Sequence, residues 1–214
     1  EHQKAKNCYE KAIAINPNYA GAHYNLGIIF NNLEENQKAK ECFEKVIAIN
    51  PKYVDAYFYL GIIFNNLKEN QKSIDCYEKA IEINSNNVPA YNNLGSVFKE
   101  LGENQKAKDI YNKALEINPG SEVILMNRGK IYFKEDKFEL SLKDTDNCNN
   151  PISRARSLIS LYALGRIDEI YERIEKNSQL DEKNIRVAAF SSFIVNKEKK
   201  NITQNFCLNP IDFI

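Results

Sequence analysis

A 34-residue internal repeat is the feature that most constrains this fold. Residues 18–51 and 52–85 are identical at 20 of 34 aligned positions, and a third copy occupies residues 87–119. A unit this short cannot bury a core by itself, so its copies must stack against one another. The sequence therefore predicts an array of similar modules in which each module packs on its neighbours.

Each unit reads as two helices joined by a short polar turn. Apolar or small residues recur at the i, i+3, i+4, i+7 spacing of one helical stripe, at Tyr57, Leu60, Gly61 and Phe64 and again at Ser73, Tyr77, Ala80 and Ile81. Asn-Pro follows the second stripe in most units, and proline cannot continue a helix. Short connections between helices indicate antiparallel pairs.

One position in the first helix of every unit is a glycine: Gly27, Gly61, Gly95 and Gly129. A glycine inside a helix costs roughly 1 kcal/mol relative to alanine. A cost repeated in every unit needs a compensating reason. We expect a neighbouring helix to cross there so closely that a Cβ atom would clash.

The repeated residues resemble the tetratricopeptide repeat (TPR) family. The third unit carries the family pattern at Tyr91, Leu94, Gly95, Phe98, Gly102, Ala107, Tyr111, Ala114 and Pro119. The fourth unit departs from it, with Arg128 in place of leucine, Thr145 in place of the second-helix aromatic, and Pro151 two residues early. The resemblance implies an all-α fold, a right-handed superhelix (solenoid) of antiparallel helix pairs with a 34-residue repeat.

The repeat pattern divides the chain into four segments. Residues 1–17 match only the second half of a unit and are expected to form the second helix of a truncated repeat. Residues 18–151 hold four TPR-type repeats, the last degenerate, and 152–183 a degenerate fifth helical pair. Residues 184–214 are expected to form a capping helix and an apolar tail, of which 201–214 either packs on the last helices or enters a groove.

Charge and hydropathy exclude several classes of function. The chain carries 29 basic and 29 acidic side chains, whereas nucleic-acid-binding proteins usually have a basic excess, so we expect no nucleic-acid partner. Apolar runs are far shorter than the roughly 20 residues of a membrane-spanning helix, and no membrane insertion is expected. With His2 and His23 as the only histidines and no phosphate-binding glycine loop, we expect no enzyme activity and no cofactor.

The cysteines form no metal-binding pattern. Cys8, Cys42 and Cys76 are 34 residues apart, but Ile110 holds the equivalent place in the next unit, which indicates a small apolar position. Equivalent atoms of stacked helices lie about 10 Å apart, too far for a disulfide or a shared ion. We therefore expect no metal, and reduced thiols favour a cytoplasmic location.

In the TPR family the first helices line a concave groove, and the resemblance implies that the ligand lies there. The corresponding positions are rich in aromatic and amide side chains: Tyr24, Asn25, Ile28, Asn31, Phe58, Tyr59, Ile62, Asn65, Asn92, Asn93, Ser96 and Asn127. An amide both donates and accepts hydrogen bonds, so Asn25, Asn93 and Asn127 could hold a peptide backbone. This row is similar to the asparagine ladder of the nucleocytoplasmic glycosyltransferases. Asparagine is also abundant elsewhere in the chain, so the row can equally reflect composition, and the aromatics can pack on their own neighbours.

The expected function is a protein–protein interaction scaffold that binds a peptide segment or partner subunit in the groove. The partner is not an acidic chaperone tail, because no cation lies where co-chaperones hold a carboxylate. The alternative is the substrate-recognition arm of a larger enzyme, such as a protein O-glycosyltransferase. A dimer through the truncated first repeat is possible, since Tyr9, Ala12 and Ile13 form an apolar face there.

Overall fold

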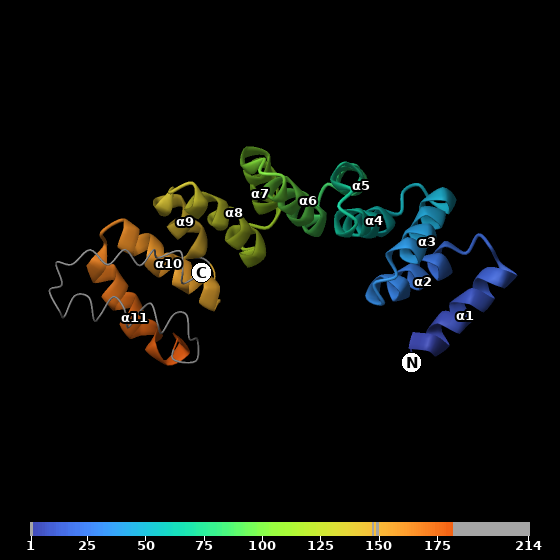
Figure 1. Ribbon diagram of the computed structural model, residues 1–214, viewed down its shortest axis with the longest axis horizontal. Helices are drawn as coiled ribbons and strands as arrows, with labels where there is room; N and C mark the ends of the chain where they lie inside the picture. The colour runs from blue at the N-terminus through green and yellow to red at the C-terminus, as the bar shows by residue number, and fades with distance from the viewer. Residues whose placement is uncertain (1, 147, 149, 182–214) are drawn as a thin grey trace. The chain divides into compact units, whose positions relative to one another are not determined.

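The computed structural model describes residues 2–146, 148 and 150–181, which form eleven helices and no strand (Figure 1). The proposed capping helix and apolar tail of residues 184–214 lie outside the described residues. The helices are α1 (His2–Ile15), α2 (Ala20–Asn32), α3 (Asn36–Ile49), α4 (Val54–Asn66), α5 (Asn70–Ile83), α6 (Val88–Glu100), α7 (Asn104–Ile117), α8 (Glu122–Lys134), α9 (Phe138–Thr145), α10 (Pro151–Ala163) and α11 (Ile167–Asp181). The all-α repeat architecture expected from the sequence is confirmed.

The chain folds as two compact units, residues 1–118 and 119–214. Unit 1 contains α1 to α7, and unit 2 begins with α8. In unit 1 the helices α2, α4 and α6 are the first members of their pairs, and each packs on the second helix of its own pair and on that of the preceding pair. We call the face formed by α2, α4 and α6 the A-face.

The glycine position marks the close crossing that the sequence predicted. A Cβ atom placed on Gly61 would lie 2.5 Å from the Tyr77 ring, and one on Gly95 would lie 2.5 Å from the Tyr111 ring. In the first full repeat the equivalent distance, from Gly27 to Phe43, is 2.9 Å. Each glycine therefore makes room for the aromatic side chain of its partner helix.

Every helix pair is joined by the same backbone turn. After α2, the Glu35 amide donates to the Phe30 carbonyl oxygen (2.9 Å) and the Glu34 amide to the Asn31 carbonyl oxygen (3.0 Å), which is the Schellman arrangement. Glu34 is left-handed, with φ of 59°. The same two hydrogen bonds close the turns after α4, α6, α8 and α10, where the left-handed residues are Lys68, Gly102, Asp136 and Gly165.

A second recurring turn joins one pair to the next. The side chain of Asn50 accepts a hydrogen bond from the Lys52 amide (3.0 Å), and Asn84 accepts one from the Asn86 amide (3.1 Å). The asparagine thus holds the turn whether proline follows it, as Pro51 does, or serine does. This explains why the repeat survives the loss of proline after Asn84.

Phenylalanines at one position of the first helices pack beneath lysines from the second helices. The Lys6 and Lys38 ammonium groups lie 5.1 and 5.4 Å from the centre of the Phe30 ring. Around Phe64, Lys40 and Lys72 lie at 5.8 and 5.5 Å. Because one lysine of each pair belongs to the preceding repeat, these cation–π contacts join neighbouring repeats.

Unit 2 departs from the regular pattern where the sequence does. Arg128, which stands in place of the repeat's leucine, makes a bidentate ion pair with Asp144: Nε–Oδ2 is 2.8 Å and Nη2–Oδ1 is 2.5 Å. The Asp144 carboxylate is nearly fully buried, so the pair replaces an apolar contact between α8 and α9. In the next pair Leu158 holds the place of the glycine, because it lies seven residues before the left-handed Gly165, as Gly129 lies seven residues before the left-handed Asp136. Leu158 belongs to an apolar cluster with Leu142, Leu161 and Ile170.

Candidate functional site

All twelve side chains predicted for the groove lie on first helices of their pairs. Eleven of them belong to unit 1 and share the A-face: four on α2, four on α4 and three on α6. Asn127 lies on α8 in unit 2. Asn25 is exposed and the others are half-buried. The side chains that the sequence selected are therefore at the surface, but most of them also pack against neighbouring side chains of the same protein.

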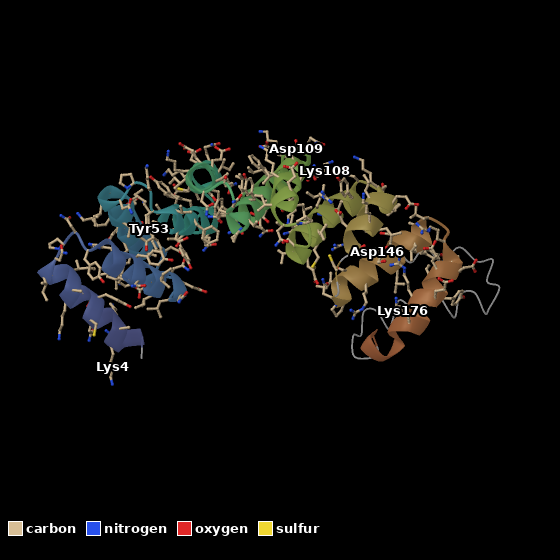
Figure 2. The ribbon with its side chains drawn as sticks, turned by 180° about the vertical axis from the view of Figure 1, so that it is seen from behind. Lys4, Tyr53, Lys108, Asp109, Asp146 and Lys176 are labelled. Atoms are coloured by element: carbon tan, nitrogen blue, oxygen red, sulfur yellow. The ribbon has the colours of Figure 1, made fainter. Side chains whose placement is uncertain are left out.

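The aromatic side chains predicted for the groove form a cluster of their own. The Tyr24 ring lies 5.1 Å from that of Tyr53, which Figure 2 labels, and 6.0 Å from that of Tyr59. Tyr59 stacks on Phe43, with centroids 5.2 Å apart and an interplanar angle of 8°. Burial, followed by the negative charge of Asp55, raises the pKa of Tyr24 well above its usual value. These rings hold neighbouring repeats together. This matches the alternative raised from the sequence, that the aromatic side chains pack on their own neighbours.

Asn93 likewise has a partner within the protein. Its Nδ2 donates to the Tyr77 hydroxyl at 3.4 Å, and its Oδ1 accepts from Asn92 Nδ2 at 3.2 Å. Burial raises the pKa of Tyr77 to about 12, although the hydrogen bond from Asn93 opposes this. Part of the hydrogen-bonding capacity expected to serve a peptide is thus used between α5 and α6.

In the row of Asn25, Asn93 and Asn127, the second full repeat carries Tyr59 instead of asparagine, and these contacts give a physical reason for that interruption. Tyr59 and Asn93 are equivalent positions, and each meets the aromatic side chain of the preceding second helix. Where that aromatic is Tyr77, its hydroxyl receives the amide of Asn93. Where it is Phe43, which has no hydroxyl, an aromatic ring covers it. The row therefore follows the chemistry of the preceding repeat.

Nearer the end of α2 and α4 the A-face carries isoleucine and amide side chains, of which Ile28 also packs on the adjacent core cluster. Ile28 and Ile62 are equivalent and half-buried, and Ser96 holds the same place on α6. Asn65, one turn after Ile62, has a buried Oδ1 that accepts no hydrogen bond from the part of the chain that the structure describes. A buried acceptor without a donor costs about 1–3 kcal/mol. This part of the A-face is apolar, uncharged and short of one donor.

A hollow of about 510 Å³ lies elsewhere, between α1, α2 and α3, and is lined by Glu10, Phe30, Lys38, Glu41 and Lys45 among others. Its charges are of both signs, and Lys38 pairs with Glu35. His23, also in its lining, has Nε2 2.9 Å from the Pro17 carbonyl oxygen. This contact gives His23 a structural role in the turn before α2.

Of the three cysteines at the repeat position, Cys42 is buried and Cys76 half-buried, whereas Cys8 is exposed. Burial raises the pKa of Cys42 to about 11 and that of Cys76 to about 12, so both are unreactive thiols at neutral pH. Within residues 2–146, 148 and 150–181 no group of three or more His, Cys, Asp or Glu side chains could hold a metal ion. The described helices also include none that is long and apolar enough to cross a membrane.

One residue at an equivalent place escaped the sequence analysis. Arg156 on α10 precedes the left-handed Gly165 by nine residues, as Asn93 precedes Gly102. Its exposed fraction is only 4%. The glycine turn was the signal that could have aligned it, but unit 2 is too degenerate for the repeat pattern to do so.

Comparison with solved structures gives relatives of the fold. The chain is similar to pilF of Pseudomonas aeruginosa (18% identity, TM-score 0.72, 89% of each chain covered) and to PilW, a type IV pilus biogenesis factor (16%, TM-score 0.70, 88% of this chain and 90% of that one). It is also similar to YrrB, a TPR protein with an unusual peptide-binding site (17%, TM-score 0.66, 86% of this chain and 97% of that one). No curated protein sequence matches the chain.

Family models agree with the repeat boundaries. The tetratricopeptide repeat model matches residues 20–53, 54–87 and 88–121, and a second TPR repeat model matches residues 1–33. Together the matches run without a gap from residue 1 to 121, which is more than half of the chain. The protein belongs to the tetratricopeptide repeat family.

Proposed function

We propose that this protein is an interaction scaffold that binds an extended segment of a partner on the A-face of unit 1. The repeat family and the similarity to YrrB, which has a peptide-binding site, support a role in protein binding. The observation that carries the proposal is the apolar, uncharged strip formed by the half-buried side chains of Ile28, Ile62 and Asn65.

The strip also indicates which kind of segment binds. Ile28 and Ile62 offer apolar surface on α2 and α4, whereas α6 presents Asn92 and Ser96 at equivalent or adjacent places. A ligand with apolar side chains over α2 and α4 and polar side chains over α6 matches this change. We expect Tyr24 and Tyr59 to contribute less contact with the ligand than the isoleucines, because their rings pack on one another and on Phe43.

A substitution taken from the protein itself tests the proposal. Ile28→Ser and Ile62→Ser introduce the side chain that the third repeat carries at Ser96, so the helices should persist. Linear peptides would first be selected from a random library on the unaltered protein, and their dissociation constants measured by calorimetry. We expect the double variant to bind them at least about ten-fold more weakly, because each isoleucine loses apolar burial.

The matched control changes two exposed residues that are also 34 positions apart, Gln37→Ser and Gln71→Ser, on second helices. It should leave the affinities unchanged. Equal binding by the isoleucine variant and the unaltered protein would show that the ligand uses another face.

A further inference from the structure

The lysine that joins one repeat to the next is replaced at the interface between α5 and α6. One repeat earlier, the Lys40 ammonium on α3 lies 5.8 Å from the centre of the Phe64 ring on α4. Ile74 holds the place of Lys40 on α5, and Phe98 holds that of Phe64 on α6, since each pair is 34 residues apart. In the described part of unit 1, Phe98 therefore has one lysine beside its ring, Lys106 at 5.4 Å, instead of two.

The same replacement leaves a glutamate without its partner. The Lys40 Nζ lies 3.9 Å from Glu44 Oε1, and the Lys6 Nζ lies at the same distance from Glu10 Oε1. Glu78 holds the equivalent place on α5, where no lysine stands one turn before it. Glu78 is exposed, and it forms no ion pair with the residues that the structure describes. Its carboxylate is available to a cation of another molecule.

A hollow of about 440 Å³ lies at this position, between α5, α6 and α7, which are neighbours in Figure 1. Its lining includes Ile74, Glu78, Phe98 and Leu101. Seven of its eight lining residues recur at the equivalent places one repeat earlier, and the eighth is Lys40 there instead of Ile74. The hollow thus has the surroundings of a lysine side chain without the lysine.

We propose that this hollow, the lysine site, binds a lysine side chain from a segment of a partner protein. The aliphatic stem of that lysine packs on Ile74 and Leu101. Its ammonium lies over the Phe98 ring and pairs with Glu78, as Lys40 does with the equivalent ring and carboxylate. The protein itself supplies the template for the contact.

The charge of the lysine site favours a cation, although Lys106 is part of the lining. The lining holds two carboxylates, Glu78 and Glu103, and one ammonium, and Lys106 is already paired with Glu103 at 2.5 Å. Two ammonium groups can also share one ring in this protein, because Lys40 and Lys72 lie 5.8 and 5.5 Å from the centre of the same phenylalanine. A second cation beside Lys106 is therefore compatible with the site.

The lysine site favours a peptide over a free amine. Asn70 lies in the same lining, and its amide can both donate to and accept from a peptide backbone. The site is separate from the strip at Ile28 and Ile62, which lies on α2 and α4. It therefore rests on a role in protein binding but not on the A-face, and either proposal can fail without the other.

Nuclear magnetic resonance on the isotope-labelled full chain tests the lysine site with two short peptides. One is a five-residue peptide of serine and alanine with a central lysine, and the other carries norleucine there, which has an uncharged side chain of similar length. The lysine peptide should shift the amide resonances of Glu78 and Phe98. We expect the norleucine peptide to bind at least about five-fold more weakly, because it loses the cation–π contact and the ion pair. Butylamine, a free amine with the same stem, should bind about three-fold more weakly than the lysine peptide, because it has no backbone for Asn70.

Three variants assign the binding to named side chains. Ile74→Lys introduces the residue that the preceding repeat carries at Lys40, so the helices should persist, and it should weaken binding at least about ten-fold by filling the site from within. Glu78→Gln should weaken binding about two- to five-fold by removing the ion pair. The matched control is Glu44→Gln, which removes the equivalent carboxylate where Lys40 is already in place. It should leave the affinity unchanged.

Several results would overturn the inference. They are unshifted resonances at Glu78 and Phe98, equally tight binding of the norleucine peptide or of butylamine, full binding by Ile74→Lys, or an equal loss in Glu44→Gln and Glu78→Gln. If Ile74→Lys does not fold, Glu78→Gln decides by itself, because it changes an exposed side chain.

Discussion

The pairing between Tyr59 or Asn93 and the aromatic side chain of the preceding repeat can be tested by transplanting one pair onto the other. Phe43 is fully buried and stacks on Tyr59, whereas Tyr77 is 1% exposed and receives a hydrogen bond from Asn93. Phe43→Tyr places a hydroxyl beneath a ring that cannot hydrogen-bond to it, which should cost about 2 kcal/mol. Tyr59→Asn removes a stacked ring and its buried area, which should also cost about 2 kcal/mol.

Together the two changes recreate the chemistry of the Tyr77–Asn93 pair. The new amide can then donate to the new hydroxyl, which removes the cost of about 2 kcal/mol assigned to an unsatisfied hydroxyl. We therefore expect the double variant to be destabilised by about 2 kcal/mol instead of the additive 4 kcal/mol, a coupling energy of about 2 kcal/mol.

Urea unfolding followed by circular dichroism measures all four proteins. Because repeat arrays unfold by nearest-neighbour terms, the curves should be fitted with a model that assigns one free energy to each interface. The reciprocal exchange, Tyr77→Phe with Asn93→Tyr, is the control and should show coupling of the same sign. If the effects add to within about 0.5 kcal/mol, the two side chains are independent and the reasoning is refuted.

Four further outcomes are expected. Gly61→Ala should lower the free energy of unfolding by about 2–3 kcal/mol, since its Cβ would lie 2.5 Å from a buried tyrosine ring, and urea titration measures this. Lys68→Gly should raise it by about 0.5–1 kcal/mol, because φ is 62° there; an unchanged midpoint would contradict this. Asp144→Asn should cost about 3 kcal/mol by leaving a half-buried arginine without its carboxylate, which thermal unfolding would report. At pH 8 iodoacetamide should modify exposed Cys8 before buried Cys42, whose raised pKa of about 11 leaves about one thiolate in a thousand, and peptide mapping of the native protein would show the order.

Most of the fold could be predicted from the repeat period, because the features that the period specifies lie within one repeat. Helix pairs, their short turns and the close crossing at Gly61 each follow from residues within one unit, where spacing and side-chain volume are visible in the sequence. The left-handed turn residues were not all visible: Gly102 signals one, but Glu34 and Lys68 take the same conformation without the glycine. There the hydrogen bonds at the helix end outweigh the preference of the residue.

The candidate site was harder to predict from the sequence, because it depends on contacts between side chains of neighbouring repeats. The sequence placed Tyr59 and Asn93 on first helices, which form the A-face, but each contacts an aromatic side chain 16 residues earlier in the chain. That contact exists only once the helices stack. The same stacking leaves Ile62 half-exposed and the Asn65 oxygen without a donor. Period and helix spacing are local properties, so the sequence by itself determined the helix pairs. Packing between repeats is not local, so only the tertiary structure decided which side chains remain available to a ligand.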